Sequence, residues 1–153
     1  LVGSEMCIRD RHTAIENSRK NQTYNTPALS TLVMLAEQVR WLNQQGGIAF
    51  AAQRTAESAS RVYSWAEKSA YAAPFVKNPK HRSNVICTVD FDESIDATRI
   101  SQTLRQAGVV DIEPYRKLGK NQLRIATFTA IEPDDVSALL RCIDYVVEDL
   151  AAK

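Results

Sequence analysis

Two arginines near predicted strands are the residues whose surroundings point most clearly to binding chemistry. Arg116 follows one apolar segment, and Arg124 lies inside another, the run Leu123-Arg124-Ile125-Ala126. A guanidinium in an apolar strand must face solvent, an ion pair or an anionic ligand, because an unpaired buried charge is costly. The pattern alone leaves a structural ion pair and an anionic ligand both open.

A second candidate site precedes a predicted helix. Asn25 and Thr26 stand before Pro27, a residue that is favourable at the first helical position. The free backbone N–H groups and the positive dipole end of a helix suit such a place to a phosphate group. Most residues of this kind only cap the helix, so capping and phosphate binding both remain open.

Other chemistry finds little support in the sequence. There is no G-x-G-x-x-G, Walker, G-x-S-x-G or H-E-x-x-H motif. The three cysteines, Cys7, Cys87 and Cys142, are widely spaced, which argues against a disulfide framework and a zinc site and favours a reducing cytoplasm. A net charge of +1 argues against nucleic-acid binding, and no apolar run approaches the roughly 20 residues that span a bilayer.

The elements that must position these residues follow from periodicity, composition and turn residues. Helices are predicted over about 27–45, 48–68, 95–107 and 132–150, and strands over 85–91, 109–115 and 123–129. Residues 71–84, which include two prolines, are predicted to be a connecting loop. The fold class is therefore α+β, with two N-terminal helices followed by a small sheet in β-α-β-β-α order.

This order suggests three parts. Residues 1–11 show no periodicity and are interpreted as a non-native remnant or a disordered terminus. Residues 12–84 form a helical segment, and residues 85–153 form a small α/β sandwich domain.

Several segments resemble phosphoserine aminotransferases of the actinobacterial type, and they do so in the right order. The resemblance includes KNQTYNTPA at 20–28, EPYRKLGKNQLR at 113–124 and shorter matches at 44–47, 61–65 and 132–136. It extends over about 12–150. The family consists of class-V, fold-type-I transaminases that use pyridoxal 5'-phosphate, and their C-terminal domain would account for the predicted sheet.

The resemblance implies an activity and a set of site residues. The enzymes are cytoplasmic homodimers that convert 3-phosphohydroxypyruvate and glutamate to phosphoserine and 2-oxoglutarate in serine biosynthesis. By this resemblance Asn25 and Thr26 would reach the cofactor phosphate of the neighbouring subunit. Arg124 would bind the substrate α-carboxylate, and Arg116 the substrate phosphate or the distal carboxylate of glutamate. Many relatives have a histidine before that second arginine, where this chain has Tyr115.

The resemblance also implies that the Schiff-base lysine precedes the Asn-Thr pair. Lys20 is too close to this pair, and every other lysine follows it. The chain is thus expected to be the C-terminal part of such an enzyme, without the catalytic lysine and inactive alone. Its 12–84 segment would pack on the cofactor domain. Two alternatives remain: a ferredoxin-like module that binds amino acids without catalysis, and an interaction domain that dimerises through the 25–47 helix.

Overall fold

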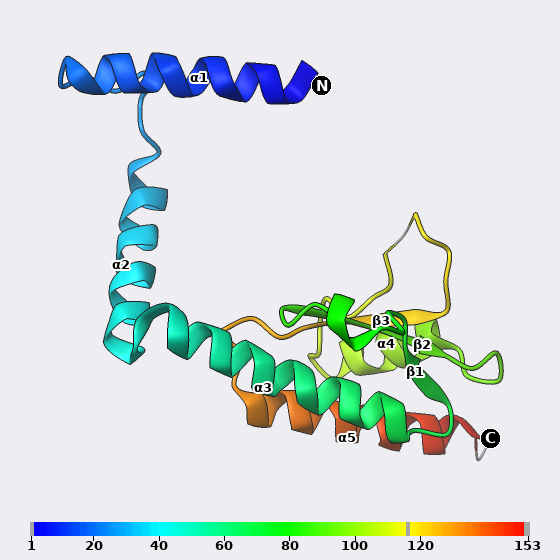
Figure 1. Ribbon diagram of the computed structural model, residues 1–153. Coiled ribbons are helices and arrows are strands. Elements are labelled where there is room, and N and C mark those ends of the chain that lie inside the picture. The colour runs from blue at the N-terminus through cyan, green and yellow to red at the C-terminus, as the bar shows by residue number, and fades with distance from the viewer. Residues whose placement is uncertain (1, 116, 152–153) are drawn as a thin grey trace. The chain divides into compact units, whose positions relative to one another are not determined.

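A computed structural model describes residues 2–115 and 117–151, with side chains over 10–115 and 117–150. The chain divides into two compact units, Leu1–Gln45 and Gly46–Lys153 (Figure 1). Among the described residues, the first unit contains two α-helices, and the second contains a sheet, three α-helices and one short 3-10 helix. None of the helices in the described part has the length and apolar character needed to cross a membrane.

Unit 1 consists of α1 (Val2–Arg19) and α2 (Leu29–Gln45). Helix α1 covers a segment where periodicity predicts no helix; it forms from a proline-free run with several strong helix formers. That residues 1–11 are non-native remains a prediction. Helix α2 is confirmed but starts later than expected. The Ala28 carbonyl accepts the Leu32 N–H at 3.1 Å, so Thr26 lies two residues before the N-cap position and the predicted capping is wrong.

The predicted helix break at Gly46 and Gly47 is confirmed, and α3 (Gly47–Lys68) follows it directly. Their φ angles are 116° and 67°, in the left-handed region that favours glycine. A Cβ on Gly46 would also lie 3.4 Å from the Phe50 Cβ. Helix α2 therefore ends here because the two glycines adopt a backbone conformation that other residues rarely adopt.

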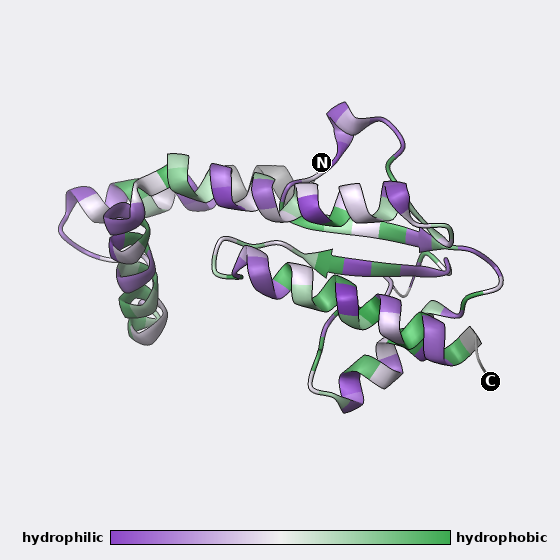
Figure 2. Cartoon of the chain, turned by 90° about the horizontal axis from the view of Figure 1, so that it is seen from below, coloured by the Kyte–Doolittle hydropathy of each residue, from purple (hydrophilic) through white to green (hydrophobic). Residues whose placement is uncertain are grey.

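The sheet of unit 2 has three antiparallel strands in the order β1-β2-β3. They are β1 (Ala72–Pro74), β2 (Ile86–Phe91) and β3 (Gln122–Ala126). Burial alternates along β2, as Figure 2 shows for hydropathy along the strands. Because successive side chains of a strand point to opposite faces, the sheet has one core face and one outer face.

Helices cover the core face. Helices α3 and α4 (Ala97–Gln106) contact the sheet, and α5 (Pro133–Ala151) contacts both of these helices. A short 3-10 helix, η1, spans Pro79–His81. The most deeply buried apolar side chains come from α3, α4, α5 and the two longer strands: Val62, Cys87, Val89, Ile100, Leu123, Ile125 and Ile143. The predicted α+β class with a small sheet after N-terminal helices is confirmed, and three helices rather than two precede the sheet because α1 covers a segment where none was predicted.

Two segments differ from the prediction in position. Residues 109–115 do not form a strand: Asp111 has a φ of 63°, Pro114 has no N–H to donate, and the Ile112 carbonyl accepts one bond, from the Arg124 N–H at 3.0 Å. Conversely, β1 lies in the segment predicted as a loop. Its Pro74 pairs with Val89 at the edge of the sheet, where a missing N–H is tolerated.

Candidate functional site

Arg124 lies in the middle of β3, and its side chain is on the outer face of the sheet. It is half-buried and stands directly opposite Thr88 of β2. Its guanidinium carbon lies 5.8 Å from the centre of the Tyr115 ring. Among the described side chains no carboxylate forms an ion pair with Arg124. Of the two roles left open by the sequence, the structure leaves this guanidinium available to an anion.

The neighbours of Arg124 on the outer face are polar and aromatic. Gln122, only 1% exposed, donates from Nε2 to the Asp90 carboxylate at 2.5 Å. The Lys120 ammonium lies 5.1 Å from the centre of the Phe75 ring. The Asp90 carboxylate is thus engaged by an amide, while Arg124 and Lys120 each lie against an aromatic ring. The sequence gives no signal for the contact between Lys120 and Phe75, because only the fold brings these distant residues together.

Asn121 holds the start of β3 in place, three residues before Arg124. Its Nδ2 donates to the carbonyls of Ile95 at 2.6 Å and Asp92 at 3.1 Å, and its Oδ1 accepts the Ala97 N–H at 2.9 Å. Its own carbonyl accepts the Phe91 N–H at 2.9 Å. One side chain thereby ties β3 to the connection between β2 and α4. The sequence offered no signal for this role beyond an asparagine in a polar loop.

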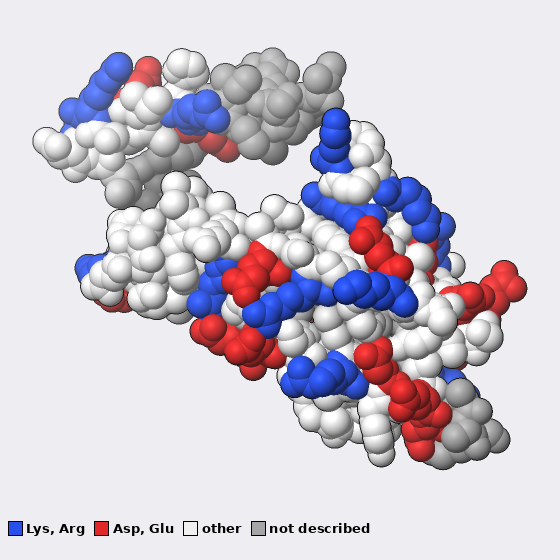
Figure 3. Space-filling view, turned by 60° about the horizontal axis from the view of Figure 1, so that its bottom comes forward, with Lys and Arg blue, Asp and Glu red and all other residues white. Residues whose placement is uncertain are grey.

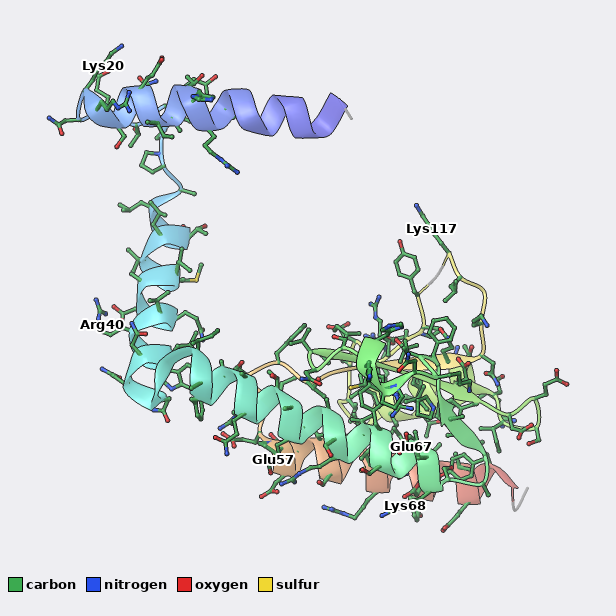
Figure 4. All side chains as sticks on the ribbon, in the orientation of Figure 1. Lys20, Arg40, Glu57, Glu67, Lys68 and Lys117 are labelled. Atoms are coloured by element: carbon green, nitrogen blue, oxygen red, sulfur yellow. The ribbon has the colours of Figure 1, made fainter. Side chains whose placement is uncertain are left out.

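Arg116, the second candidate arginine, lies outside the described residues. Its neighbours Tyr115 and Lys117 are both exposed in the loop between α4 and β3. Figure 4 shows Lys117 at the tip of this loop, pointing away from the strands. The role expected of Arg116 therefore stays a prediction.

Asn25 and Thr26 are exposed residues of the connection between α1 and α2. They belong to unit 1, whereas Arg124 belongs to unit 2. The first turn of α2 contains no acidic residue, and its leading N–H groups have no partner within the helix. A hydroxyl, an amide and free backbone N–H groups without a competing carboxylate are donors that fit a phosphate group.

A cavity of about 350 Å³ between α3 and the start of α5 is lined by charges of both signs. Arg61 donates to Asp134 at 2.7 Å, to Glu57 at 2.6 Å and to the Ser137 hydroxyl at 2.9 Å, and the bond to Asp134 raises its pKa above the usual value. Arg54 pairs with Glu132 across the same helices. Figure 3 shows such alternating charges on this side of the molecule. The compensated charges make this cluster a link between helices rather than a binding site.

The described residues contain no group of three or more His, Cys, Asp or Glu side chains that could hold a metal ion.

No protein-family model matches the chain. The chain is 59% identical over 137 residues to the phosphoserine aminotransferase of Rhodococcus jostii, which covers 90% of this chain and 37% of that protein. It is 58% identical over 141 residues to the phosphoserine aminotransferase of a Nocardioides species, covering 92% of this chain and 38% of that protein.

The fold has close relatives among solved structures. The phosphoserine aminotransferase from Bacillus circulans subsp. alkalophilus superposes with a TM-score of 0.77 at 22% identity, over 86% of this chain and 36% of that chain. The sequence matches over nine-tenths of the chain place it among the aminotransferases, and the solved structure shows that the fold is shared. Within that class it belongs to the phosphoserine aminotransferase family and matches the C-terminal region of its members.

The chain spans little more than a third of the length of these relatives. The matches do not favour the alternative of a ferredoxin-like module that binds amino acids without catalysis.

Proposed function

We propose that this chain forms the C-terminal part of a phosphoserine aminotransferase, which converts 3-phosphohydroxypyruvate and glutamate to phosphoserine and 2-oxoglutarate. The observation that supports this most strongly is the 59% identity to a phosphoserine aminotransferase over 90% of the chain. The half-buried Arg124, held on a strand without an ion-pair partner among the described residues, adds a group suited to an anionic substrate.

In this proposal Arg124 binds the α-carboxylate that the amino-acid and keto-acid substrates share. A guanidinium is planar and presents two parallel N–H groups, which match the two oxygens of a carboxylate. Strand β3 fixes the direction of the side chain, and Gln122 keeps the Asp90 carboxylate engaged. Arg124 therefore meets the substrate as a full positive charge.

Arg116 would bind the second anionic group of the substrate, either the phosphate of phosphoserine or the distal carboxylate of glutamate. This role comes from the family resemblance. It is in keeping with the sequence of the loop from 115 to 120, which also contains Lys117 and Lys120 and is therefore rich in positive charge.

Pyridoxal 5'-phosphate is the cofactor of this proposal, and it supplies an electron sink for amino-group transfer when bound. Asn25 and Thr26, with the N–H groups at the start of α2, would hold its phosphate, in the family on the neighbouring subunit. The exposure of both residues and the absence of acids from the first turn of α2 fit this role. The lysine that binds the cofactor would come from a segment that is not in this sequence.

The surface of α2 supports a further part of the proposal, that segment 12–84 packs on a cofactor domain. None of its residues is buried, and Leu29 and Met34 are 70% and 65% exposed. An uncovered apolar helix is unfavourable in water, so α2 is expected to contact another surface. We propose, from the family, a homodimer in the cytoplasm.

The test is transamination by the enzyme encoded at the full locus. Glutamate formation from phosphoserine and 2-oxoglutarate should be rapid, whereas alanine and aspartate should react far more slowly. Activity with these amino acids but none with phosphoserine would overturn the proposal. Calorimetric binding of a free amino acid without any transamination would favour the ferredoxin-like alternative.

A further inference from the structure

Tyr115 is the aromatic partner of Arg124. The guanidinium carbon lies 5.8 Å from the ring centre, within the range of an attractive contact between a cation and an aromatic ring. The tyrosine is 53% exposed and comes from the loop that precedes β3, not from the sheet. Loop and strand thus meet at the one arginine on which the proposed carboxylate site depends.

We propose that Tyr115 is a positioning residue that holds the guanidinium of Arg124 in the orientation that binds the substrate α-carboxylate. This inference rests on the proposed function and adds to it a residue that acts through Arg124.

An aromatic ring suits this role better than a carboxylate would. A carboxylate partner would accept the N–H groups that the substrate needs and would cancel the positive charge. A ring contacts the guanidinium through its π-electrons, restricts a flexible side chain and leaves the N–H donors free. The hydroxyl of Tyr115 plays no part in this contact, so phenylalanine should replace it.

The loss of the Tyr115 ring should change the KM of phosphoserine and of glutamate alike. These substrates share an α-carboxylate but differ at the other end. If Tyr115 acts through Arg124, its loss must weaken the binding of both substrates by the same factor. If instead it contacted the phosphate directly, as a replacement for the histidine of many relatives, only phosphoserine would respond.

The experiment measures KM and kcat of the full-length enzyme for phosphoserine and for glutamate. Tyr115→Ala and Tyr115→Leu should raise both KM values by a similar factor, roughly two- to thirtyfold for a contact of this type. Tyr115→Phe should keep both values near wild type. Tyr145→Ala, at a 72% exposed tyrosine on α5, is the matched control and should change neither value. In an Arg124→Lys background the effect of Tyr115→Ala should shrink.

The outcomes separate this inference from the proposed function. A wild-type enzyme that does not act on phosphoserine refutes the proposed function itself. An active wild-type enzyme in which Tyr115→Ala and Tyr115→Leu leave KM unchanged, or raise it for phosphoserine alone, refutes the positioning role. Failure of Tyr115→Phe to preserve both KM values would refute it as well. Thermal unfolding shows whether each variant folds, and either of the two ring-deletion variants suffices for the comparison.

Discussion

The Asp144 carboxylate joins α5 to α3 and to the segment just before β1, and its replacement by alanine tests how the helices are held on the sheet. It accepts the Trp65 indole N–H of α3 at 2.8 Å and a hydrogen bond from the Tyr71 hydroxyl just before β1. The Tyr71 ring also stacks on Phe91 of β2, with ring centres 6.2 Å apart and planes inclined by 20°.

The expected loss follows from these two bonds. A hydrogen bond to a charged group contributes about 1.5–3 kcal/mol, and the lower value applies because both donors are only half-buried. Asp144→Ala should therefore lower the free energy of unfolding of this chain by about 3 kcal/mol. Asp144→Asn keeps an acceptor without the charge and should cost about half as much.

Urea unfolding followed by circular dichroism measures these differences. Glu148→Ala is the control, because it removes a carboxylate from an exposed position of the same helix. A double-mutant cycle with Tyr71→Phe should show coupling of at least about 1 kcal/mol between Tyr71 and Asp144. A loss below about 0.5 kcal/mol for Asp144→Ala, or one equal to that of the control, would show that the carboxylate does not hold these elements together.

Three further predictions concern activity, the cofactor and pH. Arg124→Ala in the full-length enzyme should lower kcat/KM by about 10²–10³, and Arg124→Lys should recover little of it, because a single ammonium cannot form the paired contact; near-normal kinetics with phosphoserine would contradict the assignment. This chain alone, incubated with pyridoxal phosphate and reduced with borohydride, should yield no stoichiometrically modified lysine in peptide mass mapping; one such lysine would mean that the chain holds the catalytic residue. Burial raises the pKa of Tyr71 and Tyr63 above the usual 10, so their protonated forms are favoured in the folded state. Stability should be full below pH 10 and fall as the pH rises above it, and Tyr71→Phe should reduce this fall in urea unfolding at pH 9–11; an unchanged slope would contradict this.

The regular elements could be predicted where periodicity and backbone restrictions agree. The glycine pair at 46–47 ends a helix because both residues adopt left-handed φ, and the apolar strand 86–91 alternates in burial as its composition suggests. Residues 109–115 have the composition of a strand, but Asp111 adopts a left-handed φ of 63°, which the neighbouring residues do not indicate. Segment 72–74 shows the reverse case, since a proline is compatible with an edge strand only once its neighbour is known.

The candidate site could be predicted only in part. The composition of β3 marked Arg124 as a charge in an apolar strand, but its lack of an ion pair among the described residues and its contact with Tyr115 depend on how the loop folds back. Likewise Asn121 is an ordinary loop residue until its side chain meets the carbonyls of Asp92 and Ile95. Contacts between residues distant in sequence arise from packing and leave no local signal.

The single bond between the Arg124 N–H and the Ile112 carbonyl also has a consequence for self-association. A free strand edge exposes a row of unpaired N–H and C=O groups that can template pairing with another molecule. The loop before β3 occupies this edge, yet the turned backbone of Asp111 prevents it from becoming a new edge strand itself. Straightening this residue would offer a strand for intermolecular pairing, so the irregular loop protects the sheet from growing into a larger aggregate.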